Sequence, residues 1–206
     1  MKLYFTRHGE SEANTRRIIS NRNLPHALTQ TGREQAAALA QRLSKKTIAH
    51  IYSSPIARAR QTAEILSFKL KAPVECEHAL REPDCGILEG RADQAAWEQH
   101  NYWKEAWLQG SELEHGPQGG ETCIDVRRRL AEFIERLSNE YRNTDLEFVL
   151  VTHGALLLFG LPGLLKNVDH QFILDHGLDH TVLISAVFMD GYLVCQNWER
   201  FPGHKT

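Results

Sequence analysis

Two short apolar runs that each end in the dipeptide His-Gly constrain the fold of this chain more than any other feature. Leu3-Tyr4-Phe5 leads into Thr6-Arg7-His8-Gly9, and residues 147–151 lead into Thr152-His153-Gly154. Continuous apolar runs of this length are typical of strands that are buried in a parallel sheet. Glycine then lets the backbone turn. Because ligands bind beyond the carboxyl ends of such strands, we expect both histidines at one ligand site.

Segments with helix signals alternate with further strand-like segments along the chain. A capping-box spacing at 31–34 predicts a helix to about residue 43, and Ser54-Pro55 reads as the N-cap and first position of a helix to about residue 70. Another capping box, at 122–125, precedes a helix with a regular apolar face. Strands are expected at 50–53, 73–76 and 147–152, and a hairpin at 180–197 around Asp190-Gly191. The alternation predicts an α/β fold in three layers, a mostly parallel sheet with helices on both faces.

Residues of about 90–120 interrupt this pattern with an irregular, partly helical insertion, which we expect to form a lid over the sheet edge. Its aromatic residues fit two readings, packing of the lid or a roof over an aromatic or sugar-like leaving group; they are Trp97, Tyr102, Trp103 and Trp107. The length of 206 residues suits a single domain, 1–206, that includes this lid.

Charge and cysteine usage exclude several function classes. The net charge of −2 gives no global basic field for nucleic acid or a membrane surface, and no stretch reaches membrane-spanning length. The start of the chain has no long apolar region of a signal peptide, and none of the four cysteines makes a C-x-x-C pair. We therefore expect a cytoplasmic protein without a zinc ribbon or thioredoxin motif, either a monomer or a homodimer.

A third strand end brings more cationic chemistry to the same edge of the sheet. Ser53-Ser54-Pro55 closes the strand at 50–53, and Arg58 lies in the first turn of the next helix. A helix N-terminus favours an anion, and Arg7, Arg58 and two histidines beside it would make a pocket for a dianionic phosphoryl group. The chain has no Gly-rich loop with a lysine, so this is not a P-loop site.

With these motifs in view, the chain resembles the histidine phosphatase family, also called phosphoglycerate-mutase-like. The resemblance runs in order over most of the chain. It is carried by Arg7-His8-Gly9-Glu10-Ser11 with Asn14, Leu28-Thr29 with Gly32 and Gln35-Ala36, Ser53-Ser54-Pro55 with Arg58, Ala59, Gln61 and Thr62, Arg81-Glu82 with Gly86 and Glu89-Gly90, Gly119-Gly120-Glu121-Thr122, and Thr152-His153-Gly154.

The resemblance implies a phosphomonoesterase that works without a metal or other cofactor on a small phosphorylated metabolite. His8 would be the nucleophile, its other ring nitrogen held by a backbone carbonyl and its pKa lowered by the arginines nearby. Arg7, Arg58 and His153 would hold the phosphoryl oxygens. Glu82 would be the general acid and then the base, with its pKa raised by the bound phosphate.

Further substrate contacts are implied at Asn14, Thr152 and Gly154. In the first loop, Arg16, Arg17 and Arg22 are either solvated or placed to bind a second anionic group of the substrate. Where the family often has an asparagine near the start of the strand after the 153–165 segment, this chain has His180.

Three alternatives stay open. One is mutase chemistry, in which the phosphoryl group returns to a bound acid, although the compact segment 84–90 favours a phosphatase. Another is a non-catalytic protein that binds phosphorylated ligands on the same fold. The third is a metal-dependent hydrolase built on three Asp-His pairs at 169–180, a stretch that we interpret instead as a polar loop leading into the hairpin.

Overall fold

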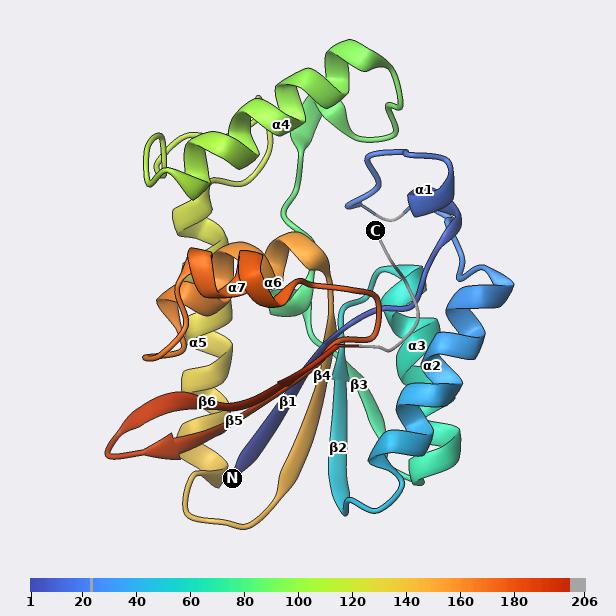
Figure 1. Cartoon of the computed structure of the whole chain (residues 1–206), viewed down its shortest axis with the longest axis vertical. Coiled ribbons are helices and arrows are strands. Elements are labelled where there is room, and N and C mark those ends of the chain that lie inside the picture. Colours follow the sequence, from blue (N-terminus) through green and yellow to red (C-terminus); the bar gives the residue numbers. More distant parts are fainter. Residues whose placement is uncertain (23, 201–206) are drawn as a thin grey trace.

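The computed structural model describes residues 1–22 and 24–200. Over these residues six strands form one sheet in the order β3-β2-β4-β1-β5-β6 (Figure 1). The strands are β1 (Lys2–Arg7), β2 (Ile48–Ser53), β3 (Val74–Cys76), β4 (Glu147–Thr152), β5 (Leu183–Met189) and β6 (Tyr192–Glu199). The first four are mutually parallel, and the hairpin β5–β6 adds antiparallel strands next to β1. The expected α/β class and the terminal hairpin are confirmed.

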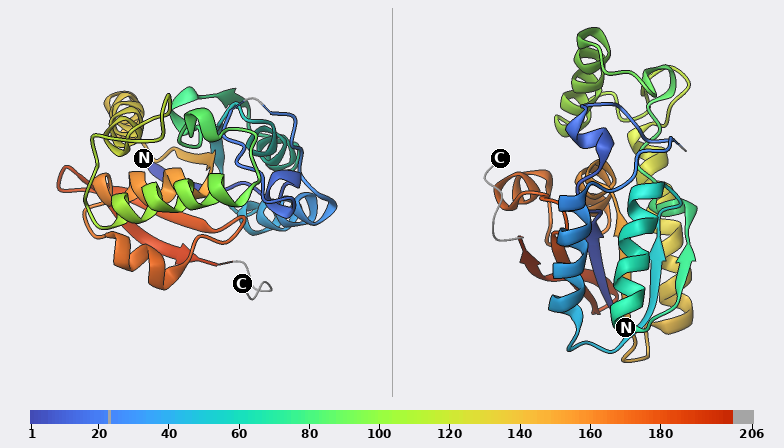
Figure 2. Two further views of the ribbon diagram at one scale, coloured as in Figure 1. Left: turned by 90° about the horizontal axis from the view of Figure 1, so that it is seen from above. Right: turned by 90° about the vertical axis from the view of Figure 1, so that its right-hand side faces the viewer.

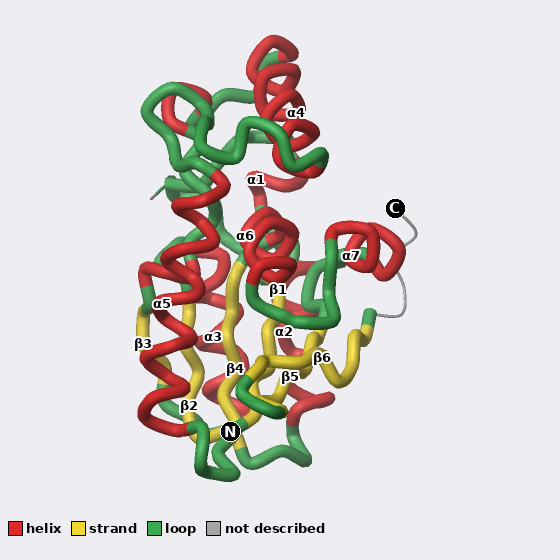
Figure 3. The backbone as a smooth tube through the Cα atoms, turned by 90° about the vertical axis from the view of Figure 1, so that its left-hand side faces the viewer, coloured by secondary structure: helices red, strands yellow, loops and turns green. Residues whose placement is uncertain are grey.

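Helices cover both faces of the sheet (Figure 3). The α-helices are α1 (Glu12–Thr15), α2 (Gln30–Leu43), α3 (Ala57–Leu70), α4 (Gln94–Leu108), α5 (Cys123–Tyr141), α6 (Gly154–Gly160) and α7 (His170–His176), and short 3-10 turns lie at His78–Leu80, Gly86–Leu88 and Leu161–Gly163. Helices α2 and α3 pack on one face, and α5 and α6 pack on the other.

The apolar run in β1 shows why the sheet is buried on both sides. Leu3 and Phe5 belong to the core under α5 and α6, whereas Tyr4 belongs to the core under α2 and α3. Successive side chains of a strand point to opposite faces, so a strand between two helical layers has to be apolar at every position. This burial fixes where β1 ends, and therefore where His8 emerges.

Two helices begin at residues other than those predicted. Helix α2 is capped by Thr29, whose hydroxyl accepts a hydrogen bond from the amide of Gly32, so the start at Thr31 was wrong by two residues. Helix α3 begins at Ala57 rather than at Pro55. The hydroxyl of Ser54 accepts the amide of Ile56 instead of capping a longer helix, and Ile56 itself has an extended backbone directly before α3.

The insertion lies over the carboxyl ends of the parallel strands and not at the side edge of the sheet. Helix α4 crosses above these ends (Figures 1 and 2). Its N-cap is Asp93, which accepts the amide of Ala96. Within the described residues, no helix combines the length and the apolar character that crossing a membrane requires.

The stretch at 169–180 is partly helical, so its interpretation as a loop was wrong for residues 170–176. Asp169 caps α7 by accepting the amide of Phe172, and Gly177, with φ of 73°, ends the helix. A residue with positive φ costs little when it is glycine, and this makes Gly177 an effective helix stop.

Candidate active site

The carboxyl edge of the sheet brings together side chains from three separate segments. His8 follows β1, His153 follows β4, and Arg58 comes from the first turn of α3. All three are buried, and the rings of His8 and His153 meet edge to face with 5.0 Å between their centroids. His8, His153 and Arg58 therefore lie together, as the sequence predicts.

Hydrogen bonds on both ring nitrogens fix the protonation state of His8. Its Nδ1 lies 2.6 Å from the carbonyl oxygen of Gly9, and the Nε of Arg58 lies 2.9 Å from its Nε2. A carbonyl only accepts and a guanidinium only donates, so Nδ1 carries the hydrogen and Nε2 carries the lone pair. The site therefore holds a neutral imidazole with the lone pair that can act as a nucleophile on Nε2.

The electrostatics of the site favour the same state. Burial lowers the pKa of His8 well below its ordinary value of 6.5, and the positive charge of Arg58 lowers it further. Repulsion from His153, Arg7 and His180 acts in the same direction. The arginines thus contribute as predicted, but desolvation is the larger cause.

The backbone after His8 is held by a very close approach of two glycines. A Cβ on Gly9 would lie 2.3 Å from the carbonyl oxygen of Gly32 in α2, and a Cβ on Gly32 would lie 1.9 Å from the carbonyl oxygen of Glu10. The amide of Gly9 also donates to the hydroxyl of Thr62 in α3. Only glycine fits at this crossing, which locks the Gly9 carbonyl that orients His8.

Arg7 and Arg58 present buried donors that have no partner among the described residues. They are Nε of Arg7 and Nη1 of Arg58, while Nη1 of Arg7 donates to the carbonyl oxygen of Leu178. Burial lowers the pKa of Arg58 to about 10, so it stays charged at neutral pH. Unpaired buried cationic donors are costly, and an anion between them would satisfy both.

His153 also has one engaged and one unengaged ring nitrogen. Its Nε2 lies 2.7 Å from the hydroxyl oxygen of Ser54, whereas Nδ1 is buried and has no partner among the described residues. Burial, with Arg58 next, lowers the pKa of His153 well below its ordinary value. The ring is therefore neutral, and a proton on Nδ1 would let it donate to an anion.

Glu82 follows the 3-10 turn at His78–Leu80, and its carboxylate lies against the N-terminus of α6, where Glu82 lines the same cavity. Its carboxylate accepts the amides of Ala155 and Leu156, each at 3.1 Å. Burial raises the pKa of Glu82, and this effect outweighs the opposing influence of Arg58, the two amides and Arg7. The raised pKa was expected from a bound phosphate, but the ligand-free protein already produces it by desolvation.

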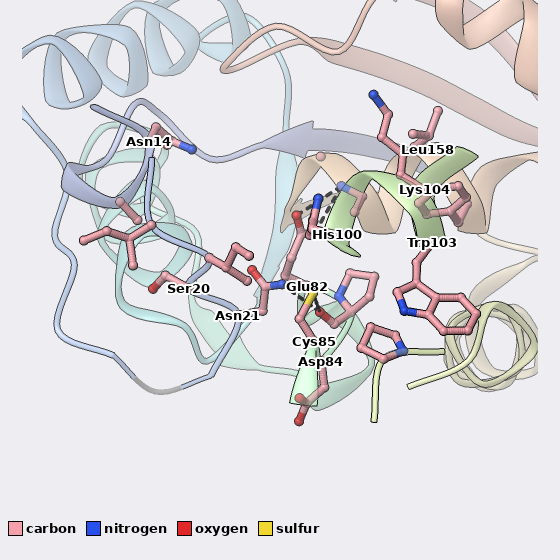
Figure 4. Close-up of a pocket in the computed structure, with 18 of the residues that line it drawn as sticks. Asn14, Ser20, Asn21, Glu82, Asp84, Cys85, His100, Trp103, Lys104 and Leu158 are labelled. Atoms are coloured by element: carbon pink, nitrogen blue, oxygen red, sulfur yellow. Dashed lines mark hydrogen bonds between the residues drawn. The ribbon is translucent and has the colours of Figure 1, made fainter. Parts of the chain in front are cut away.

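One cavity of about 320 Å³ connects Arg7, His8, Arg58 and Glu82 with the lid, whereas His153 lies behind them and is not part of its lining. Its lining includes Arg7, His8, Arg58 and Glu82, and Figure 4 shows Glu82 between Asn14 and Asn21 on one side and Trp103 of α4 on the other. Pockets for small molecules commonly range upward from about 300 Å³, so this cavity is at the small end.

The remaining predicted substrate contacts differ in position. Gly154 and Asn14 line the cavity. The Oδ1 of Asn14 accepts both the amide and the hydroxyl of Ser11, which leaves its amide nitrogen to face the cavity (Figure 4). Thr152 is fully buried and does not line the cavity, because its hydroxyl donates to the carbonyl oxygen of Leu80. The Thr152 hydroxyl is thus occupied within the protein, and the cavity lining gives the predicted substrate contact of Thr152 no support.

The arginines of the first loop do not line the cavity either. Arg22 forms an ion pair with Asp84, and the guanidinium of Arg17 lies over the ring of Trp97. Arg16 is exposed. These contacts favour the interpretation that the three arginines are surface side chains over the one in which they bind a second anionic group of the substrate.

The three Asp-His pairs point to different neighbours rather than to one centre. His170 lies against Phe159, His176 stacks on Phe172, and Asp179 pairs with Arg200. Across residues 1–22 and 24–200, no group of three or more His, Cys, Asp or Glu side chains is arranged to hold a metal ion.

His180, by contrast, belongs to the candidate active site. Its ring centroid is 5.8 Å from that of His8, and its Nε2 is 3.3 Å from the Oδ1 of Asn14. His180 was identified from the sequence as a departure from the family pattern and as a member of the Asp-His pairs, but not as a neighbour of His8. Its place directly before β5, which pairs with β1, could have indicated that it returns to the carboxyl edge.

Two cavity residues from α4 were missed by the sequence reasoning, His100 and Lys104. The signal was present in the helical spacing of Trp97, His100, Trp103 and Trp107, which share one face. The tryptophans define a helix face that lines the cavity, and the same face also carries these two polar side chains.

Comparisons with known proteins agree with this geometry. The model of the histidine phosphatase superfamily (branch 1) matches residues 3–200. Among curated relatives, a probable phosphoglycerate mutase GpmB from Photorhabdus laumondii is 32% identical over 168 residues, covering 79% of this chain and 76% of the relative. A protein of the same name from Serratia proteamaculans is 30% identical over 188 residues, covering 83% and 86%.

Solved structures extend the likeness to the whole fold. A mycobacterial glucosyl-3-phosphoglycerate phosphatase, solved with VO3, is 26% identical, covers 96% of this chain and 98% of its own, and has a TM-score of 0.81. YhfR from Bacillus stearothermophilus is 26% identical over 94% of each chain, with a TM-score of 0.75. By its sequence, its fold and the residues gathered at its carboxyl edge, this chain belongs to the histidine phosphatase superfamily.

Proposed function

We propose that the protein is a phosphomonoesterase that hydrolyses a small phosphorylated metabolite through a phosphohistidine on His8. One observation carries the proposal: a neutral His8, its Nε2 lone pair fixed by two hydrogen bonds, shares a cavity with Glu82, whose pKa is raised. A nucleophile and a general acid in one buried site are the two groups that phosphoryl transfer to an enzyme requires.

In the first step Nε2 of His8 attacks phosphorus, and the bond between phosphorus and the ester oxygen breaks. Glu82 gives its proton to that oxygen, and the alcohol leaves. The unpaired donors of Arg7 and Arg58 would bind the phosphoryl oxygens, with Nδ1 of His153 and the amide of Asn14 as further donors. Before this attack, as the substrate binds, Arg58 exchanges its hydrogen bond to His8 for one to the phosphoryl group, which frees the Nε2 lone pair.

In the second step the ionised Glu82 takes a proton from a water molecule, and the water oxygen attacks the phosphoryl group. The bond between nitrogen and phosphorus breaks, inorganic phosphate leaves, and both His8 and Glu82 return to their starting states. The hydrogen bond from Nδ1 to the Gly9 carbonyl supports the positive charge that the ring carries as a phosphohistidine.

The lining of the cavity supports hydrolysis over mutase chemistry. Its basic side chains, apart from histidines, are Arg7 and Arg58 at the phosphoryl end and Lys104 in α4. A phosphoglycerate carries a carboxylate next to its phosphate, and a mutase has to bind it in two orientations. The apolar wall beyond Glu82, which includes Ile18, offers little to such a polyanion.

Mutase activity remains the second candidate, because the curated relatives carry that name. The proposed chemistry needs no metal, since Arg7 and Arg58, each with a buried unpaired donor, supply positive charge at the phosphoryl group.

Hydrolysis of p-nitrophenyl phosphate in excess chelator tests the proposal, with wild type and His8→Ala compared. We expect turnover that survives chelation and is lost in His8→Ala. Conversion of 3-phosphoglycerate to 2-phosphoglycerate, measured in the same preparations, tests the mutase. Turnover that chelation abolishes, or that His8→Ala retains, would rule out the phosphohistidine route.

A further inference from the structure

Helix α4 presents one face to the catalytic cavity. Residues three and four apart on a helix lie on the same side. Trp97, His100, Trp103, Lys104 and Trp107 follow this spacing, and all five line the cavity that contains His8 and Glu82. Seen from above, α4 crosses over the carboxyl ends of the strands (Figure 2). This face therefore meets the part of a substrate that leaves with the alcohol.

Two of these side chains are used to fasten the helix. Trp107 is buried against Phe159, with ring centroids 5.0 Å apart, and its Nε1 donates to the carbonyl oxygen of His115. The Nε1 of Trp97 donates to the carbonyl oxygen of Arg17 in the first loop. The Nε1 of each indole is hydrogen-bonded within the protein, so Trp97 and Trp107 hold α4 in its position above the site.

Trp103 and His100 lie between these two fastening points. Trp103 touches the ring of Tyr102 edge to face at 5.1 Å, and Tyr102 itself is 57% exposed. The indole of Trp103 borders the cavity (Figure 4). His100 also lines the cavity, and its buried Nδ1 has no hydrogen-bond partner among the described residues.

Apolar side chains from other elements also line the cavity. Ile18 and Ile19 come from the first loop, and Leu158 and Phe159 from α6. A cavity of about 320 Å³ that also houses the phosphoryl group leaves room for a leaving group of one small ring system. Indole and aliphatic walls favour a planar apolar ring over a polyhydroxylated sugar, whose hydroxyls would lose their hydrogen bonds to water.

We infer that the α4 face selects phosphomonoesters whose alcohol carries a planar aromatic ring with a hydrogen-bonding atom, the ring lying against Trp103 and the polar atom meeting Nδ1 of His100. This inference rests on the proposed phosphatase activity and specifies its substrate class. Trp103 and His100 act as specificity-determining residues for the ring, away from the phosphoryl end of the cavity.

Two esters of primary alcohols, 2-phenylethyl phosphate and butyl phosphate, test the ring preference because their leaving groups differ little in acidity. We expect wild type to favour the phenylethyl ester about tenfold in kcat/KM. Trp103→Ala should abolish most of this preference, and Trp103→Phe should keep it. Tyr102→Ala, which removes the exposed neighbouring ring, is the matched control and should leave the preference unchanged.

Pyridyl analogues of the phenylethyl ester test His100. We expect one positional isomer to exceed the phenyl compound in kcat/KM for wild type and to lose this advantage in His100→Leu. No advantage for any isomer would overturn the role of His100. Equal kcat/KM for the phenylethyl and butyl esters would overturn the ring preference. Because both esters are still hydrolysed in that case, the result differs from failure of the proposed function, in which neither ester turns over.

Discussion

The Nε of Arg58 donates a hydrogen bond to the Nε2 of His8 across 2.9 Å, and both side chains are more than nine-tenths buried. This contact identifies Nε2 as the nitrogen with the lone pair, since the Gly9 carbonyl takes the hydrogen on Nδ1. It also means that the nucleophile is covered until an anion draws the guanidinium away. Binding of the phosphoryl group and exposure of the nucleophile are thus the same event.

Replacing Arg58 by lysine should lower kcat/KM for p-nitrophenyl phosphate by about 10²–10³-fold. Lysine keeps the charge but loses the fork of donors that serves His8 and the phosphoryl oxygens together. Steady-state kinetics measure the effect. Arg60→Lys is the matched control one half-turn away, since Arg60 is exposed and pairs with Glu64 at the surface. Equal losses in the two variants would contradict the role of Arg58.

The pH profile of kcat/KM should be displaced toward acid. Attack requires neutral His8, whose pKa lies well below 6.5, so activity persists as the pH falls below that value. Proton donation requires protonated Glu82, whose pKa lies above 4.5, so activity declines as the pH rises through that raised pKa. This decline should appear with butyl phosphate, whose leaving group needs a proton, and should be absent with p-nitrophenyl phosphate, whose leaving group needs none. An equal decline with both esters would assign it to another group.

Glu82→Gln should also be more stable than wild type at pH 8. In the folded state the pKa of Glu82 is raised above its ordinary value of 4.5, so folding at high pH carries the cost of ionising a buried carboxyl. This penalty is absent below 4.5 and grows as the pH rises through the folded-state pKa. The amide oxygen of glutamine can still accept from Ala155 and Leu156. Thermal unfolding at pH 5 and pH 8 should show a gain that is larger at pH 8; a gain that does not change with pH would refute this account.

His180→Ala should reduce kcat/KM by about tenfold, because its contact with the Oδ1 of Asn14 helps to direct the Asn14 amide into the site. His176→Ala is the matched control, since His176 belongs to the same Asp-His series but stacks on Phe172. Kinetics on both variants give the comparison. If the two behave alike, His180 has no part in positioning Asn14.

Much of this architecture was predictable because the apolar runs that end in polar residues are local features of the sequence. The runs before His8 and His153 identified buried strands, and parallel strands bring their carboxyl ends to one edge. Caps were harder to place, since Thr29 and Thr31 are equally good candidates by type and only the contact with Gly32 distinguishes them. Thr152 was assigned to the substrate because the sequence does not reveal which way a hydroxyl at a strand end points.

The lid was the least predictable part. Its position above the carboxyl edge depends on contacts between residues far apart in the chain, such as Trp97 with the carbonyl of Arg17. The pairing of His180 with Asn14 spans 166 positions and has no local signal. The raised pKa of Glu82 likewise results from burial by other segments, which a sequence does not state.

Trapping the phosphoryl group tests the central claim most directly. Glu82→Gln is mixed with p-nitrophenyl phosphate, quenched in alkali within the first turnovers, and analysed by mass spectrometry of the intact chain and its peptides. The account predicts one phosphoryl group per chain, on the peptide that contains His8, labile to acid and absent from Glu82→Gln combined with His8→Ala. A phosphoryl group on any other residue, or continued release of p-nitrophenol from a chain that never becomes phosphorylated, would contradict it.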